Sequence, residues 1–419
     1  MKKSKTKTVL STTMVLLIVF SVISPTNAVL QAPLIQWQRT YGASSGDSLT
    51  QASDGGFAVA AKVSGGPSSG FNEIIKTDKE GNVLWNVTIG ETPISDEWIM
   101  ATSDGGFAVA RRSDNSSITG SIIKVDAQGK VQWNQTYAQP GYGAFINYAI
   151  KTKDNGFALI GQMASGNTWL IKTDSEGNVQ WDKTYENFNG TLIAQTNDGN
   201  YVIAGDSGGN QTTLFKSDLA KTDQQGNIQL IKVYDSQLGF RPRSLITTSD
   251  GGLMLAGYNF PNDTSVSAFA LKTDTNGNFE WNKTFGENSG FRLAIEDSQG
   301  GYIFAGGVYT SQPRYSARLI KTDAFGTSLW ETSYKGQGNG YVYSLTQTAN
   351  NSYVFTGATS KVNSSTTQMW MIKVAPTQNE PLQLNWIVST AIAAATIAII
   401  ILATIIYNRK KPNSKHSPQ

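Results

Sequence analysis

One recurring position carries most of the chemical variety in this chain of 419 residues. Ten residues before each copy of a repeated, mostly aromatic position stand Asp47, Glu97, Asn147, Thr191, Arg243, Arg292 and Tyr343. Carboxylates facing guanidinium groups can hold a polar or zwitterionic molecule, and Trp98, next to Glu97, can stack on a sugar or a peptide. We therefore predict a ligand-binding ring formed by these residues, Thr191 excepted, together with Trp98. Solvated loop ends are the alternative interpretation of the ring, and ordinary packing is the alternative for Trp98.

Asp47 and Glu97 are also the one obvious pair of acids for a glycan hydrolase, which needs two positioned carboxylates. The composition excludes most other familiar enzyme chemistry. The chain has no Cys, and its single His, His416, lies in the last four residues. The folded part therefore offers no thiolate nucleophile, no disulfide and no imidazole. We expect a binding module rather than an enzyme, with no cofactor and no metal.

Two short motifs recur at a spacing of about 50 residues and define the architecture. The first runs from a Lys to a Trp, as in Lys76–Trp85. Its further copies are Lys124–Trp133, Lys172–Trp181, Lys272–Trp281 and Lys321–Trp330, with a weaker one at Lys221–Leu230. The second is a turn such as Asp54-Gly55-Gly56 followed by a strand. Its seven copies centre on Phe57, Phe107, Phe157, Tyr201, Leu253, Tyr302 and Tyr353.

Each unit has the pattern of four strands, with tight turns after the first and third strands and a variable stretch after the second. In the first copy the strands are expected at residues 48–52, 57–63, 73–77 and 83–88. In the last turn, Asp78 can cap a type I turn through its side chain, and Gly81 can take the left-handed conformation. A calcium loop would need more alternating oxygen ligands than these turns offer. Seven such units predict an all-β, seven-bladed β-propeller, because a blade buries both faces only against its neighbours.

The two ends of the repeat region predict how the ring closes. The seventh copy ends with a strand at residues 369–374 and lacks its fourth strand. Residues 35–41 read as an orphan fourth strand, since they resemble residues 180–185. We predict that this segment completes the last blade and so removes two exposed sheet edges. The Trp of each fourth strand is predicted to be a wedge between blades.

The turn aspartate and glycine, the outer aromatic and the Thr-Tyr-Gly ending at residues 40–42 give the units a family likeness. They resemble the seven-bladed β-propeller repeats of bacterial and archaeal surface proteins and, more distantly, the repeats of quinoprotein dehydrogenases. The resemblance covers about residues 34–375 and implies the propeller architecture. The quinoprotein enzymes use adjacent Cys residues and a calcium-bound quinone, whereas this chain has no Cys and a turn one residue shorter between Asp and Trp.

Both ends of the chain carry targeting patterns. Four Lys, an apolar run and a small residue at the cleavage point are typical of a secretory signal peptide. Near the other end, 20 uncharged residues followed by a basic tail are typical of a transmembrane helix. The expected parts are a signal peptide at 1–28, a propeller ectodomain at 29–376, a linker at 377–386, a membrane helix at Ile387–Ile406 and a cytoplasmic tail at 407–419. We expect a single-pass plasma-membrane protein with its ectodomain outside.

The charge distribution gives no reason to expect a nucleic-acid partner. The whole chain has 34 basic and 31 acidic residues, but four Lys at the start and four Lys or Arg at the end belong to the targeting segments. The part between them is acidic, with 26 basic and 31 acidic residues. A nucleic-acid-binding protein would instead show a basic stripe or patch.

The loops between the second and third strands vary in length and content, whereas the other hairpin turns are short and regular. Binding usually resides in variable loops on a regular scaffold, so we expect these loops to face outward and the short turns to face the membrane. The glycosylation candidates in the outward loops are Asn115, Asn210, Asn262 and Asn363. The sequence thus indicates an adhesion or binding module for an unknown extracellular protein or glycan. An acid-only glycan hydrolase, a quinone-dependent dehydrogenase and a purely structural envelope component are the alternatives.

Overall fold

The computed structural model describes most of residues 32–376. The internal gaps are residues 66–68, 91–96, 113–118, 139–143, 208–215, 235–238, 263–264, 311–314, 362–363 and 365. The expected signal peptide, linker, membrane helix and tail lie outside the described residues. Within the described part, no helix has both the length and the apolar character needed to span a membrane.

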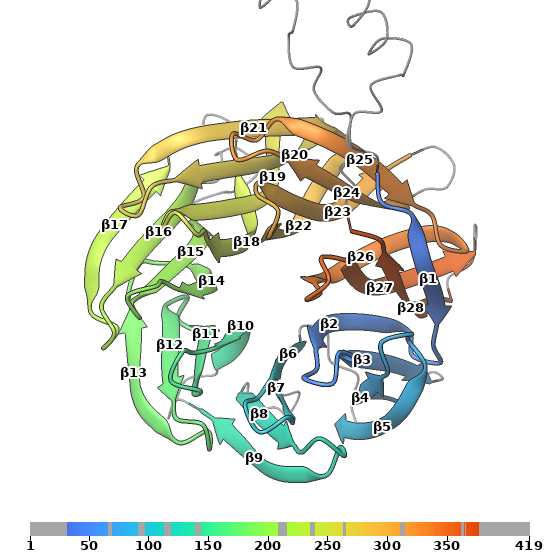
Figure 1. The fold of residues 1–419 in the computed structure, drawn as a ribbon. Coiled ribbons are helices and arrows are strands. Elements are labelled where there is room, and N and C mark those ends of the chain that lie inside the picture. Colours follow the sequence, from blue (N-terminus) through green and yellow to red (C-terminus); the bar gives the residue numbers. More distant parts are fainter. Residues whose placement is uncertain are drawn as a thin grey trace, which may run out of the picture. The chain divides into compact units, whose positions relative to one another are not determined.

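The described residues form seven four-stranded antiparallel sheets, and each sheet is one blade (Figure 1). Blade 1 contains β2 (Ser45–Gln51), β3 (Phe57–Gly65), β4 (Ser69–Thr77) and β5 (Val83–Gly90). Blade 2 contains β6 (Glu97–Ala101), β7 (Phe107–Arg112), β8 (Gly120–Val125) and β9 (Val131–Tyr137). Blade 3 contains β10 (Ala144–Lys151), β11 (Phe157–Met163), β12 (Thr168–Thr173) and β13 (Val179–Tyr185). Blade 4 contains β14 (Gly190–Gln195), β15 (Tyr201–Ser207), β16 (Lys216–Thr222) and β17 (Ile228–Tyr234).

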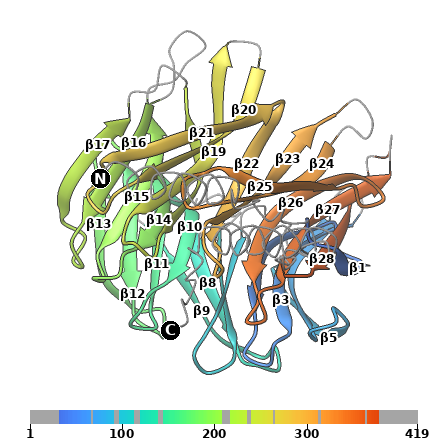
Figure 2. The same cartoon turned by 45° about the horizontal axis from the view of Figure 1, so that its top comes forward.

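The remaining three blades follow the same order. Blade 5 contains β18 (Arg241–Thr247), β19 (Leu253–Asn262), β20 (Ser265–Thr273) and β21 (Phe279–Glu287). Blade 6 contains β22 (Ser289–Glu296), β23 (Tyr302–Tyr309), β24 (Tyr315–Thr322) and β25 (Ser328–Tyr334). Blade 7 contains β26 (Gly338–Gln347), β27 (Tyr353–Lys361), β28 (Gln368–Val374) and β1 (Ile35–Thr40). The first strands of neighbouring blades contact each other all the way round, from β2 through to β26 and back to β2, as Figures 1 and 2 show.

The predicted closure of the ring is confirmed. β1 pairs antiparallel with β28, and the register places Ile35 opposite Val374 and Thr40 opposite Trp370. The blue β1 therefore lies beside the red β28 in Figure 1. Beyond the strand, the Tyr41 amide donates to the Met369 carbonyl at 2.9 Å. The edge of β28 is thus covered by the start of the chain, which leaves blade 7 with four strands like the others.

The predicted turn chemistry is also confirmed. The Asp78 carboxylate accepts the backbone N–H groups of Glu80 at 2.9 Å and Asn82 at 2.8 Å, and Gly81 has a φ of 82°. Two strand bounds of blade 1 need a clear correction. The third strand begins at Ser69 rather than at residue 73, because its pairing with β3 extends to Gly65. The first strand of blade 1 begins at Ser45 rather than at residue 48, because it continues through a bulge beyond the expected start.

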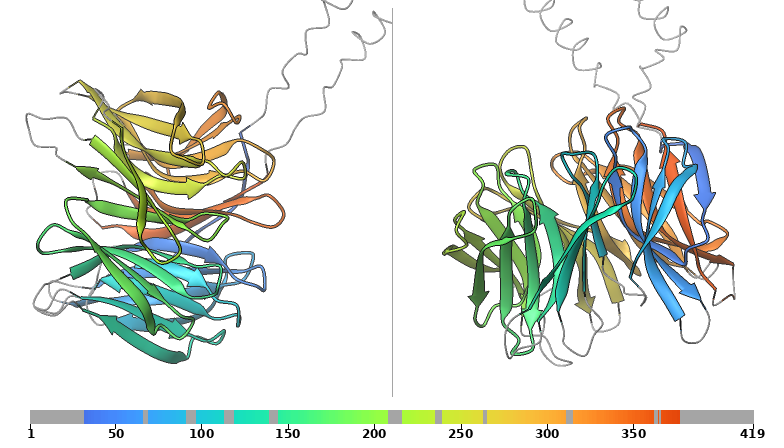
Figure 3. Two further views of the ribbon diagram at one scale, coloured as in Figure 1. Left: turned by 90° about the vertical axis from the view of Figure 1, so that its left-hand side faces the viewer. Right: turned by 90° about the horizontal axis from the view of Figure 1, so that it is seen from below.

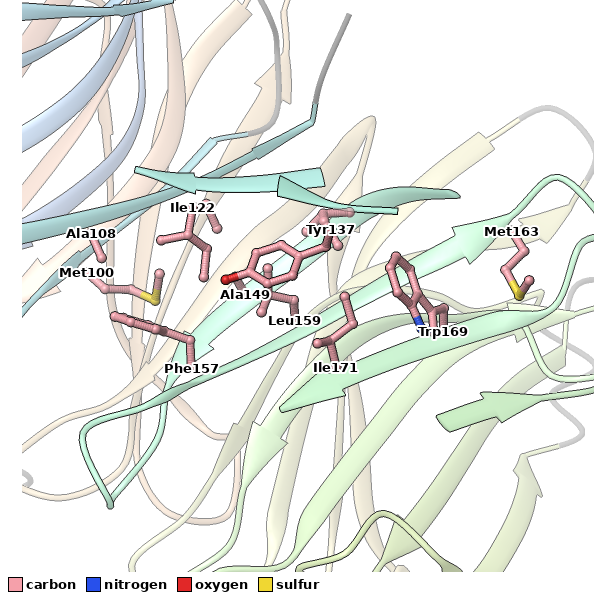
Figure 4. Packing of buried hydrophobic residues seen from close by; sticks show 12 residues of the cluster. Met100, Ala108, Ile122, Tyr137, Ala149, Phe157, Leu159, Met163, Trp169 and Ile171 are labelled. Carbon is pink, nitrogen blue, oxygen red and sulfur yellow. The ribbon is translucent and has the colours of Figure 1, made fainter. Parts of the chain in front are cut away.

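The two repeat motifs meet each other across the blade interfaces. The Trp of a fourth strand lies against the aromatic residue that begins the second strand of the next blade. The ring centroids are 6.1 Å apart for Trp85 and Phe107 and 6.3 Å apart for Trp133 and Phe157. The Trp85 indole also donates to the Ala127 carbonyl in the next blade at 3.1 Å. Figure 4 shows the buried cluster at the interface of blades 2 and 3, which includes Phe157, and Trp133 packs against this cluster. The predicted wedge between blades is therefore confirmed.

A tyrosine near the end of the fourth strand forms a second link to the next blade. The Tyr137 hydroxyl donates to the Gly177 carbonyl at 2.8 Å, and the Tyr185 hydroxyl donates to the Gly226 carbonyl at 2.7 Å. Each acceptor is the left-handed glycine of a turn between the third and fourth strands. The ring is thus held by indole and phenol groups that reach forward by one blade.

In the five copies of the first motif that end in Trp, unlike the weaker copy with Lys221, the opening Lys is a buried structural residue. Its ammonium group pairs with the aspartate of the turn between the first and second strands of the same blade, at 2.7 Å for Lys76 and Asp54 and 2.8 Å for Lys124 and Asp104. The lysine side chains are 5% exposed in both pairs, and the aspartates are about half exposed. The Lys lies near the end of the third strand, and its partner lies in the turn between the first and second strands. The turns that join the first to the second strand and the third to the fourth strand therefore lie at the same end of the blade, called the short-turn face below. The opposite end, where the second and third strands are joined, is called the variable face.

We expect this pairing to make the stability depend on pH. Burial alone would raise the pKa of Asp104, but hydrogen bonds from Lys124, Thr102 and the Gly106 amide lower it from 3.8 to about 2. A lowered pKa in the folded state gives stability that is full above pH 3.8 and is lost as the pH falls toward 2. D104N should cost up to about 1 kcal/mol of unfolding free energy at pH 7, since the Asp104 side chain is half exposed. Urea titrations at pH 7 and pH 2 should show this difference shrinking in acid; an equal difference at both pH values would contradict the pairing.

Candidate functional site

The recurring position singled out in the sequence is a β-bulge in six of the seven blades. In each of these blades the first strand skips one residue in its pairing with the second strand. The skipped residues are Asp47, Asn147, Thr191, Arg243, Arg292 and Tyr343. In blade 2 the equivalent residue, Glu97, is the first residue of β6, and the residues before it are not described. A bulge redirects a side chain out of the regular alternation of a strand. The ring of these six residues and Glu97, near the start of the first strands, is called the rim below.

In five of the six bulged blades a recurring glycine makes room for the bulge, whereas blade 1 has Ala61 at this place. Gly161, Gly205, Gly257, Gly306 and Gly357 stand in the second strands, each four residues after the repeated position of the second motif. A side chain at any of them would collide with a backbone carbonyl at the bulge of the first strand. Glycine inside a strand often marks such a close approach. The spacing of these glycines is the signal in the sequence that indicates the bulges.

The residue that follows the bulge ties neighbouring first strands together in three places. The Ser48 hydroxyl accepts the Ile99 amide of the next blade at 3.1 Å. The Ser344 hydroxyl accepts the Leu49 amide at 3.0 Å across the closure of the ring. A third bond of the same kind joins Ser244 to the Ala294 amide at 3.0 Å. At these three interfaces the bulges therefore lie on first strands that are hydrogen-bonded to each other.

Three of the predicted site residues come together on blades 6, 7 and 1. The Arg292 guanidinium carbon lies 4.7 Å from the centre of the Tyr343 ring. Burial raises the pKa of Tyr343; the charge of Arg292 lowers it and that of Asp47 raises it, so both charges act on this phenol. The Asp47 carboxylate also accepts the Ser45 hydroxyl at 2.8 Å. A cation, a phenol and an anion thus follow one another along the rim.

Arg243, on blade 5, is held in a similar way. Its guanidinium donates to the Tyr258 hydroxyl at 2.7 Å and lies over the same ring, 5.3 Å from its centre. Arg243 and Arg292 are both exposed, and neither forms an ion pair with any residue that the structure describes. Two other arginines differ, because Arg241 pairs with Asp206 and Arg318 pairs with Glu331. The two rim guanidinium groups are therefore positioned and still available to an anion.

The other predicted residues, Glu97, Trp98 and Asn147, have side chains that are wholly or partly buried between neighbouring strands and blades. Glu97 is only 2% exposed and faces Arg111 directly in the β6–β7 ladder. The Trp98 ring lies 5.7 Å from the Tyr148 ring of the next blade and packs against the core between blades 2 and 3. The Asn147 side-chain nitrogen is buried and has no hydrogen-bond partner among the described residues. Whether these residues bind a ligand stays a prediction.

The remaining predicted features are only partly described. Asn262 is the last residue of β19, whereas Asn115, Asn210 and Asn363 lie outside the described residues. Glycosylation therefore stays a prediction. In the described ranges, His, Cys, Asp and Glu nowhere gather in groups of three or more that could hold a metal ion.

The fold defines the chain as a seven-bladed β-propeller built from repeats. No protein-family model matches the chain, and no curated protein matches it. Among solved structures it is similar to the Dos1 propeller, with 13% identity over 80% of this chain and 86% of that one and a TM-score of 0.49.

Two further solved structures are proteins of unknown function. One, from Dyadobacter fermentans DSM 18053, has 12% identity over 82% of this chain and 99% of that one, with a TM-score of 0.49. The other, from Bacteroides caccae, has 14% identity over 61% of this chain and 84% of that one, with a TM-score of 0.38. Similarities at this level carry no information on function.

Proposed function

We propose that this chain is a membrane-anchored extracellular binding module that holds a protein or a glycan on its variable face. The bulged rim is the observation that carries the proposal. Six blades repeat the same backbone irregularity, and yet the side chain at that place changes from acid to amide, hydroxyl, guanidinium and phenol. A regular scaffold that presents variable side chains at one end is the usual design of a binding surface.

The ends of the described chain support the proposed orientation. The Ala375 amide donates to the Leu34 carbonyl at 2.8 Å, so the chain enters and leaves blade 7 at one place. That place is the short-turn face, because Val374 lies opposite Tyr353, the first residue of β27. A following membrane helix at residues 387–406 would be joined to this face by about ten residues. The variable face would then point away from the lipid, as cell-surface recognition requires.

We predict that the rim arginines contribute strongly to binding. The full-length chain in detergent is applied to arrays of immobilised glycans and extracellular proteins, alone and as R243Q/R292Q. The double variant should bind its best array ligand at least about tenfold more weakly, because it loses two positioned charged donors. The control is K79Q/K130Q, which removes the same charge from the short-turn face and should leave binding unchanged. Equal binding by all three proteins, or no ligand on either array, would contradict the proposal.

A further inference from the structure

A continuous row of tyrosine rings runs from a hairpin of the variable face to the rim. Tyr309 and Tyr315 face each other across the β23–β24 hairpin of blade 6, with centroids 5.4 Å apart. Tyr315 then contacts Tyr341 of blade 7 at 5.1 Å, and Tyr341 contacts Tyr343 at 6.3 Å. Arg292 lies over the last ring. The row is not visible in the sequence, because its members come from separate strands of two blades.

The row is accessible to a ligand. Tyr309 is 48% exposed, and Tyr315, Tyr341 and Tyr343 are partly exposed. The large buried aromatics of the core, such as Tyr353 and Phe355, are completely inaccessible by comparison. A tyrosine combines an apolar ring with a polar hydroxyl, and it contributes contact area at a low cost in conformational entropy. A sugar ring has the complementary character, with an apolar C–H face and a polar edge.

The row ends at a pair of positively charged groups. Arg292 lies on β22, and Tyr258, which positions Arg243, packs against the same strand beside Gly290. The two guanidinium groups therefore stand on neighbouring blades, each held by a tyrosine ring. A guanidinium that is already positioned loses little conformational freedom when it donates two hydrogen bonds to two oxygens of a carboxylate or a sulfate.

We infer that the row of tyrosines and the two arginines bind an anionic oligosaccharide, with sugar rings along Tyr309, Tyr315, Tyr341 and Tyr343 and an acidic group at Arg292 and Arg243. The inference rests on the proposed function and specifies its ligand class. Neither feature alone defines this ligand. The row of tyrosines without the arginines would suit a neutral glycan, and the arginines without the row would suit any anion.

The test compares ligands that differ in one property at a time. The full-length chain is titrated calorimetrically with a hexamer of galacturonic acid, with the same hexamer fully methyl-esterified, with a sulfated hexasaccharide and with hexaglutamate. We expect one of the two acidic sugars to bind at least about tenfold more tightly than the ester and the peptide. Tighter binding of the uronate or of the sulfated sugar identifies the acidic group. Ester or peptide binding as tight as that of both acidic sugars would overturn the inference.

Two variants of Tyr309 test the row separately from the charge. Y309A should weaken binding of the tighter-binding acidic sugar by about tenfold, whereas Y309F should leave this binding unchanged. The reason is that stacking needs the aromatic ring and not the hydroxyl group. Tyr309 is half exposed and lies at the end of a hairpin, so the melting temperature should be the same in both variants. Unchanged binding by Y309A would overturn the role of the row. If the acidic sugars fail while R243Q/R292Q still loses an array ligand, the inference is wrong and the proposed function stands.

Discussion

Deletion of residues 29–42 is expected to abolish folding of the propeller. These residues contain β1, which covers the edge of β28, a strand whose central residues are buried. They also reach into both neighbouring blades. The Tyr41 hydroxyl donates to the Gly81 carbonyl of blade 1 at 2.8 Å, and the Tyr334 hydroxyl of blade 6 donates to the Pro33 carbonyl at 3.3 Å. The deletion therefore opens two blade interfaces and leaves an unpaired hydrophobic edge that favours aggregation.

A transplant of the same segment is the matched control. In the folded chain Ile35 lies opposite Val374, just as Val131 lies opposite Val125 in blade 2. Residues 126–130 could thus join a copy of residues 35–42 directly after Val374 in the deleted chain. We expect this transplant to restore a soluble protein with a cooperative thermal transition, measured by circular dichroism. Wild-type melting of the deletion itself, or failure of the transplant, would contradict closure by this strand.

The second large effect is expected for D297A. Asp297 is the one turn aspartate among the five pairs described whose side chain is completely buried, and it pairs with the buried Lys321. It also accepts the Tyr353 hydroxyl at 2.8 Å and the Gln347 side chain at 2.7 Å, both from blade 7. The variant would leave a buried ammonium group without its carboxylate and should cost about 3–5 kcal/mol of unfolding free energy. Urea denaturation measures this loss.

The corresponding lysine of blade 1 provides the control for D297A. Lys76 pairs with Asp54, which lies two positions later in its turn than Asp297 does. The Asp54 side chain is 54% exposed, so water can replace it. D54A should therefore cost only about 1 kcal/mol. Equal losses in the two variants would show that burial of the pair does not decide its contribution.

Repetition explains why most of the fold could be predicted. The Asp-x-x-Gly turns and the strand-forming stretches are local patterns, and seven copies make each of them visible. The closing strand was predictable for the same reason, since residues 35–41 repeat a fourth strand that the last copy lacks. The meeting of Trp85 with Phe107 could be expected only as a wedge, because the partner depends on how blades pack.

The site was less predictable, because the spacing of the repeated motifs does not determine the register of the strands or the contacts between blades. A bulge present in nearly every copy leaves the repeat period unchanged, so Asp47 and Arg292 appeared as variable residues and not as bulges. The burial of Glu97 opposite Arg111 depends on the pairing of β6 with β7. The contact between Tyr315 and Tyr341 joins two blades and exists only after folding. The charged residues of the rim could be identified from the sequence, whereas their contacts became known only from the structure.

Hydrogen–deuterium exchange of the full-length chain, with and without its best array ligand at saturation, tests the central claim most directly. The ligand should slow exchange in β22 and β26, which carry Arg292, Tyr341 and Tyr343, and at the ends of β23 and β24 next to Tyr309 and Tyr315. Exchange in the turns around Gly81 and Gly129 on the short-turn face should not change. Protection of those turns instead, or no protection at the rim under saturating ligand, would contradict a binding surface on the variable face.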